Sequence, residues 1–144
     1  MRTRLLLLFG LVVALGCGNA KFAPVSGTIT MDGKPLPHVA VSFQPVDEGK
    51  LNSGPGSFAQ TDDEGKFSLK AVGGGSGAVV GKHRVEIRPV VEGTADNDRP
   101  SKPKVNIPVE YNMKSSLTYE VKPGNNTDAN FDIKSHPSSA PPRQ

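Results

Sequence analysis

Apolar and polar residues alternate in two neighbouring stretches, residues 25–31 and 39–44. Successive side chains of a β-strand point to opposite faces, so each stretch predicts a strand with one buried row and one row toward solvent. Asp32 and Gly33 lie between the two stretches, and these residue types tolerate the positive φ angles of a tight turn. The segment therefore predicts two half-buried strands joined by a turn.

Shorter alternating stretches follow along the chain. They are residues 58–61, 66–70, 81–88, 116–121 and 129–134. The acidic segment 62–65 ends in Gly65, which predicts a hairpin turn between the stretches 58–61 and 66–70.

The clustered carboxylates of segment 62–65 also suit calcium, but an EF-hand loop needs ligands spread over about twelve residues and a distal Glu. Here Lys66 and Phe67 follow at once, so a solvated turn is the better interpretation.

The strand pattern and the composition together predict the fold class. A chain of 144 residues favours one domain, and 16 glycines with 13 prolines favour short strands joined by turns over a helical bundle. About seven strands in roughly 110 residues are typical of a two-sheet antiparallel sandwich. We therefore expect an all-β, seven-stranded antiparallel sandwich over residues 25–134.

The segments between the strands are polar. Residues 46–57 and 89–106 predict two long loops, and loops of that length often carry binding function. Pro108 interrupts residues 107–111, which we expect to form an edge or a bulged segment at best. Residues 135–144 are rich in Pro and Ser and predict a disordered tail.

The N-terminal residues have the pattern of an export signal. Arg2 and Arg4 precede an apolar run, so residues 1–16 predict a signal peptide that is too short to span a bilayer. Cys17, the single cysteine, follows directly. Residues 14–17 resemble the bacterial lipobox, in which signal peptidase II cuts before a cysteine that carries a diacylglycerol.

The lipobox resemblance is close but incomplete. Gly16 and Cys17 match it, whereas Ala14 and Leu15 stand where the pattern prefers Leu and then a small residue. The resemblance implies lipidation of Cys17, with residues 17–24 forming the lipidated cysteine and a tether. The alternatives are an ordinary secretory signal followed by a chance cysteine, or an uncleaved anchor.

The charge balance argues against nucleic acid as a partner. The net charge of +3 includes Arg2 and Arg4, and without them 15 Lys and Arg stand against 14 Asp and Glu. The remaining basic residues are scattered along the chain, so we expect no phosphate-neutralising surface.

The residues indicate no catalytic or metal site. His38, His83 and His136 lack the close spacing typical of a zinc or copper site, and we interpret His83 as a partly buried strand residue. Serines and threonines fall mostly at exposed positions, without a Gly-x-Ser-x-Gly context. We therefore expect no enzyme activity, no cofactor and no bound metal.

Several strand and turn motifs together resemble a known family. They are residues 25–30, 32–36, 39–43, the T-D-x-x-G-x-F pattern of 61–67, and residues 107–111, 116–118 and 130–132. The chain resembles the transthyretin-like, carboxypeptidase-regulatory-like modules over residues 25–133, and small lipoproteins of this type from planctomycete-like bacteria. The resemblance implies a prealbumin-like Greek-key sandwich outside the cytoplasm, usually without assigned activity. The related hydroxyisourate hydrolases end in Tyr-Arg-Gly-Ser, which this chain lacks.

These observations predict a lipid-anchored, non-catalytic β-sandwich of the bacterial envelope, on a periplasmic or surface-facing side of a membrane. Its loops 46–57 and 89–106 would bind an envelope protein or a polysaccharide. Two alternatives stay open: a small periplasmic hydrolase that uses His38 or His83, and a self-associating structural protein.

Overall fold

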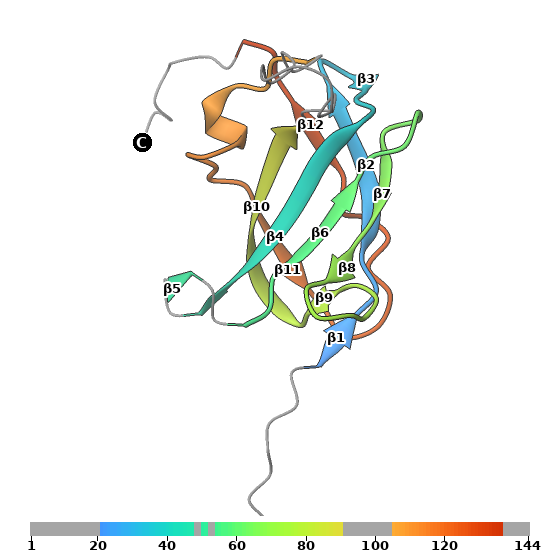
Figure 1. Ribbon diagram of the computed structural model, residues 1–144, viewed down its shortest axis with the longest axis vertical. Helices are drawn as coiled ribbons and strands as arrows, with labels where there is room; N and C mark the ends of the chain where they lie inside the picture. Colours follow the sequence, from blue (N-terminus) through green and yellow to red (C-terminus); the bar gives the residue numbers. More distant parts are fainter. Residues whose placement is uncertain (1–20, 48–49, 52–53, 91–104, 137–144) are drawn as a thin grey trace, which may run out of the picture.

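The chain folds into β-sheets, as alternation predicts (Figure 1). The computed structural model describes residues 21–47, 50–51, 54–90 and 105–136. The predictions for residues 1–16, for Cys17, for most of the loop 89–106 and for most of the tail lie outside these residues. Within them, no helix has the length and apolar character needed to cross a membrane.

The described residues form twelve strands, several of them only two residues long, and one turn of 3-10 helix. The strands are β1 (Phe22–Ala23), β2 (Ser26–Met31), β3 (Lys34–Pro35), β4 (Val39–Asp47), β5 (Lys50–Leu51), β6 (Ser57–Gln60), β7 (Lys66–Ser68), β8 (Lys70–Ala71), β9 (Ala78–Val79), β10 (Gly81–Pro89), β11 (Thr118–Val121) and β12 (Phe131–Ile133). The 3-10 turn covers Val109–Tyr111.

Two larger sheets hold most of the strands. One has the order β11-β10-β4-β6-β8, with β5 paired to the end of β4, and the other has the order β12-β2-β3, with β7 also paired to β2. β1 and β9 form a small third sheet. The pairing of β12 with β2 is parallel, unlike the other strand pairings, so the fully antiparallel prediction is wrong at this position. Parallel neighbours need a long connection, and all strands of the other large sheet lie between β2 and β12 in the chain.

The two larger sheets face each other across a common core. Phe43 of β4 has no exposed area, and its ring lies 6.3 Å from that of Phe67 and 6.3 Å from that of Phe131. Both neighbours come from the sheet that contains β2. The buried row predicted for residues 39–44 is confirmed, since Val39, Val41 and Phe43 are all fully buried.

The acidic turn does not close a simple hairpin. β6 pairs with β4 and β8, whereas β7 pairs with β2, so the turn carries the chain from one large sheet to the other. Buried Thr61 fixes the start of this crossing, since its hydroxyl donates to the carbonyl of Leu36 at 2.8 Å and accepts from the N–H of Val39 at 3.0 Å. The carbonyl of Gly65 then accepts from the N–H of Ile29 at 2.8 Å.

Two further segments differ from their predictions. Part of the predicted loop 46–57 is strand, because β4 continues to Asp47 and pairs there with Lys50 of β5. In residues 107–111 the chain forms a 3-10 turn instead of an edge strand. Pro108 precedes this turn, and its fixed φ of −57° suits the start of a helical turn.

Candidate functional site

His83 occupies an inward position on β10. Its neighbours on the same face, Val85 and Ile87, are fully buried, and so is His83 itself. The imidazole ring lies 5.8 Å from the ring of Phe43. The prediction of a partly buried histidine therefore underestimates its burial, since the ring of Phe43 on β4 packs against it and Tyr119 of β11 stands opposite it in register.

The ring nitrogens of His83 have different environments. Nδ1 lies 3.0 Å from the carbonyl oxygen of Gly81. A carbonyl oxygen only accepts hydrogen bonds, so Nδ1 carries the proton and Nε2 presents a lone pair. Among the described residues Nε2 has no hydrogen-bond partner, and it is shielded from solvent. Burial lowers the pKa of His83, against the opposing effects of the Gly81 carbonyl and the Glu120 charge, which favours the neutral ring.

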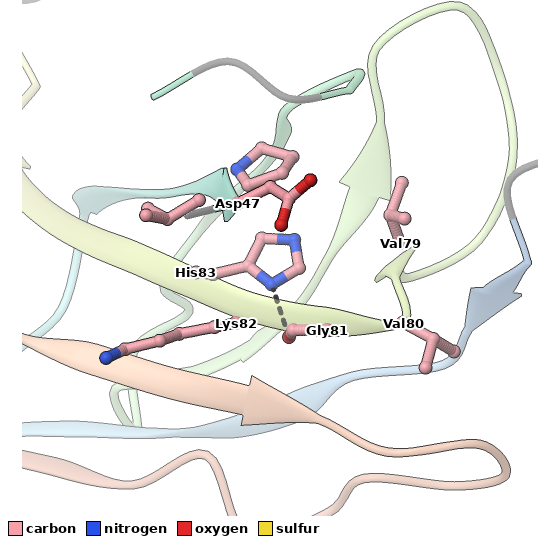
Figure 2. A pocket seen from close by; sticks show the side chains of 8 residues that line it. Asp47, Val79, Val80, Gly81, Lys82 and His83 are labelled. Atoms are coloured by element: carbon pink, nitrogen blue, oxygen red, sulfur yellow. Dashed lines mark hydrogen bonds between the residues drawn. The ribbon is translucent and has the colours of Figure 1, made fainter. Parts of the chain in front are cut away.

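His83 lies in the wall of a pocket of about 370 Å³ (Figure 2). The pocket is lined by Pro45, Val46, Asp47, Val79, Val80, Gly81, Lys82 and His83. His83 pairs in register with Pro45, and Asp47 follows two positions later on the same face of β4. Diagonal positions of that kind lie within reach of long side chains. In Figure 2 the Asp47 carboxylate lies beside the imidazole, on the side away from Gly81.

Val79 and Val80 form the opposite wall of the pocket, and both are held by the first described part of the chain. Val79 pairs with Phe22 of β1, and the N–H of Val80 donates to the carbonyl of Lys21 at 2.8 Å. The pocket therefore lies between the end of β4, which begins the predicted loop 46–57, and residues 79–80, which pair with residues 21–22 inside the predicted tether 17–24.

The other two histidines do not line this pocket. His38 is exposed at a φ of 54°, and its Nε2 lies 2.9 Å from Oδ1 of Asp63, which is also exposed. His136 is exposed beside Ser135. In the part of the chain that the structure describes, no group of three or more His, Cys, Asp or Glu side chains could hold a metal ion.

A second polar cluster lies on the outward row of β10. Glu86 is only 3% exposed, although its place in the alternation predicts an outward, solvated position. Arg84 and Arg88 lie two residues to either side on the same face, and each forms an ion pair with the Glu86 carboxylate. The Arg-x-Glu-x-Arg spacing in the sequence could have predicted these ion pairs, because residues two apart on a strand share a face.

The comparisons with known proteins give no relative for this chain: no protein-family model, no curated protein and no solved structure matches it.

Proposed function

We propose that this protein is a lipid-anchored module of the bacterial envelope that binds a partner and catalyses no reaction. In this proposal Cys17 carries the lipid, and the sheets form a prealbumin-like Greek-key sandwich of the transthyretin-like type. The partner is an envelope protein or a polysaccharide, and part of its contact surface is the segment that starts at Val46.

The observation that supports binding is the convergence of this segment with His83. Val46 and Asp47 line the same pocket as a buried imidazole whose Nε2 has no partner among the described residues. A buried polar atom without a partner costs about 1–3 kcal/mol, and a bound group that donates a hydrogen bond removes this cost. A buried polar atom without a partner calls for an explanation in a native structure, and a bound ligand, ion or water supplies one.

The same pocket favours binding over hydrolysis. A neutral histidine beside a carboxylate resembles the base and orienting group of a hydrolase. The described lining residues include no Ser, Thr or Cys that could act as the nucleophile for that base. The lining combines apolar walls with a few polar groups, those of His83, Asp47 and Lys82, which is the composition of a recognition site.

The anchor is tested by replacing its attachment point. We expect Cys17→Ala to move the protein from the membrane fraction to the soluble fraction and to change its electrophoretic mobility, since two or three acyl chains are lost. Membrane association and mobility equal to those of the unchanged protein would contradict the anchored role.

The binding surface is tested by photo-crosslinking in native envelopes. A photoreactive residue at Val46 probes the pocket, and one at Val72, which is 59% exposed and outside the pocket lining, serves as the control. We expect one recurring partner from position 46 and only scattered captures from position 72. Scattered captures from both positions would refute a recognition role, and capture of this same chain would favour the self-associating alternative.

A further inference from the structure

A hollow of about 390 Å³ lies on the solvent side of strands β4, β6 and β8, which are neighbours in the larger sheet (Figure 1). Its lining includes Ala40 of β4, Phe58 and Gln60 of β6, Ser68 of β7 and Lys70 of β8. All of these except Ala40 are exposed. A ligand therefore reaches the hollow without any rearrangement of the fold.

Phe58 gives the hollow an apolar surface. The side chain is 53% exposed, and in register it stands between Ser42 of β4 and Lys70 of β8. Ser42 and Ala40 are successive outward residues of β4, and because both are small they form a low floor beside the ring. The C–H face of a sugar ring packs well on an aromatic ring that is open to solvent in this way.

The charge around the hollow is positive. Lys70 has no ion-pair partner among the described residues. Arg88 stands opposite Ala40 in the register of β10 and β4, on the same outward face. Arg88 and Arg84 share the single carboxylate of Glu86, so these three side chains together keep one positive charge. Glu86 is only 3% exposed, so its carboxylate does not face a ligand.

Other charges leave this balance unchanged. Lys82 and Glu120, which are also outward residues of β10 and β11, stand opposite each other in register. The carboxylates of the acidic turn 62–65 do not line the hollow. The described part of this surface therefore favours an anionic ligand.

The polar groups of the lining suit a sugar. The Gln60 amide and the Ser68 hydroxyl both donate and accept hydrogen bonds, as sugar hydroxyl groups do. The backbones of β10 and β8 are three strand spacings apart, about 14 Å, so a chain of sugars reaches Arg88 and Lys70 better than one ring does. We infer that the hollow binds an acidic oligosaccharide, with one ring on Phe58 and carboxylates paired with Lys70 and Arg88.

This surface is separate from the one that begins at Val46. Neither Val46 nor His83 lines the hollow, so the inference depends neither on that segment nor on the His83 pocket. Val72 does not line it either. A sugar chain that runs from Lys70 toward Arg88 leads away from Val72, which lies toward Gly56 at the other end of β6.

The inference is tested by isothermal titration calorimetry on the full processed protein in detergent micelles. The probes are hexasaccharides of galacturonate, glucuronate and mannuronate. The matched control for each is its methyl ester, which keeps the sugar chain but has no charge. We expect at least one of the three acids to bind in a saturable manner, more weakly as the salt concentration rises, and its ester to bind at least about tenfold more weakly.

Substitutions test the position of the site. Phe58→Thr removes the ring and should weaken binding by at least about threefold, and Lys70→Gln removes one charge and should weaken it by about two- to fivefold. Both side chains are exposed, so neither change removes core packing. Lys122→Gln is the matched control, because Lys122 is also exposed but follows β11 at the other edge of the sheet. It should leave the affinity unchanged.

Several results would overturn the inference. They are no saturable binding of any of the three acids, equal binding of acids and esters, or equal weakening by Lys70→Gln and Lys122→Gln. Equal binding of polyglutamate of the same charge would identify an acidic protein as the occupant instead, and self-association that Phe58→Thr abolishes would identify a second copy of this chain. The recurring partner expected at Val46 is decided by its own crosslinking experiment, so the proposed binding role stands or falls separately.

Discussion

At the scale of single residues, the burial of His83 links the stability of the protein to pH. Burial lowers its pKa from the usual 6.5, so the folded protein resists protonation that the unfolded chain accepts. The stabilising contribution of the neutral imidazole is therefore complete above pH 6.5 and is lost as the pH falls below that value. The charged groups around the ring include Asp47 on β4 and Lys82 on β10, which line the same pocket, and Glu120 on β11, whose charge opposes the lowering of its pKa.

We expect the free energy of unfolding to fall between pH 6.5 and pH 5.5, by at most about 1 kcal/mol, because His83 binds more protons in the unfolded chain than in the folded protein over this range. Denaturant titrations at the two pH values measure it. His83→Phe keeps a ring at this position and should remove the difference. As a control, His38→Asn should retain it, since Asn tolerates the φ of 54° at that position.

Other groups with shifted pKa values act in a different pH range. The pKa of Asp132 falls from 3.8 to about 2, chiefly because Lys134 pairs with it, and the hydroxyl of Tyr119 lowers the pKa of Asp128. Their stabilising contributions are present above pH 3.8 and are lost only below it. A protein equally stable at pH 6.5 and pH 5.5 would therefore contradict the neutral state of His83 itself.

At the scale of elements, the small β1–β9 sheet depends on Gly77. Its N–H donates to the carbonyl of Leu69 at 2.8 Å, and its φ is 89°. A Cβ atom at this position would lie 1.8 Å from the carbonyl oxygen of Ala23, which is far inside contact distance. Gly74 has a similar φ of 94°, but a Cβ there would meet nothing within 4 Å.

The two glycines therefore form a matched pair for mutation. Both alanine variants carry a cost of about 1–2 kcal/mol for a left-handed backbone angle. Gly77→Ala must also displace β1, so we expect it to be less stable than Gly74→Ala by at least about 2 kcal/mol in urea unfolding. Equal losses for the two variants would show that β1 yields without cost and does not hold the wall of the His83 pocket.

At the scale of the whole molecule, the proposed anchor orients the domain. β1 lies at one end of the fold, beside β9 (Figure 1). Lys21 is four residues after Cys17, so a lipid on that cysteine keeps this end within about 14 Å of its attachment point. Phe22 of β1 is 42% exposed at this end, where its apolar ring is available to contact the membrane.

Because the chain contains no tryptophan, a single introduced Trp reports this orientation. We expect the fluorescence of Phe22→Trp in the lipidated protein to be quenched by brominated lipids in vesicles. Phe58→Trp places the probe on β6 at a residue that is 53% exposed, and it should be quenched much less. Equal quenching at the two positions, with lipidation verified by mass spectrometry, would refute the orientation while leaving the anchor intact.

The sequence by itself determined the features that depend on near neighbours. Alternation predicted the buried rows of β4 and β10, whereas only Ile29 is buried in β2. Asp32-Gly33 adopts the positive φ angles of 52° and 77° that its turn chemistry indicated. Strand alternation and turn type are read from residues within a few positions of each other, so no distant contact is needed. The lipidation of Cys17, the family resemblance and the binding role stay predictions.

The tertiary structure decided what depends on register between distant segments. β7 pairs with β2 and not with β6, Glu86 is buried between two arginines, and Nε2 of His83 faces a pocket that Asp47 also lines. These features cannot be predicted from a local sequence pattern, because they depend on the register between strands. A shift of one residue between β4 and β10 would place Asp47 and His83 on opposite faces of the sheet. On β4 and β10 the alternation specified which residues face inward, and only the folded register brought Asp47 and His83 into one pocket.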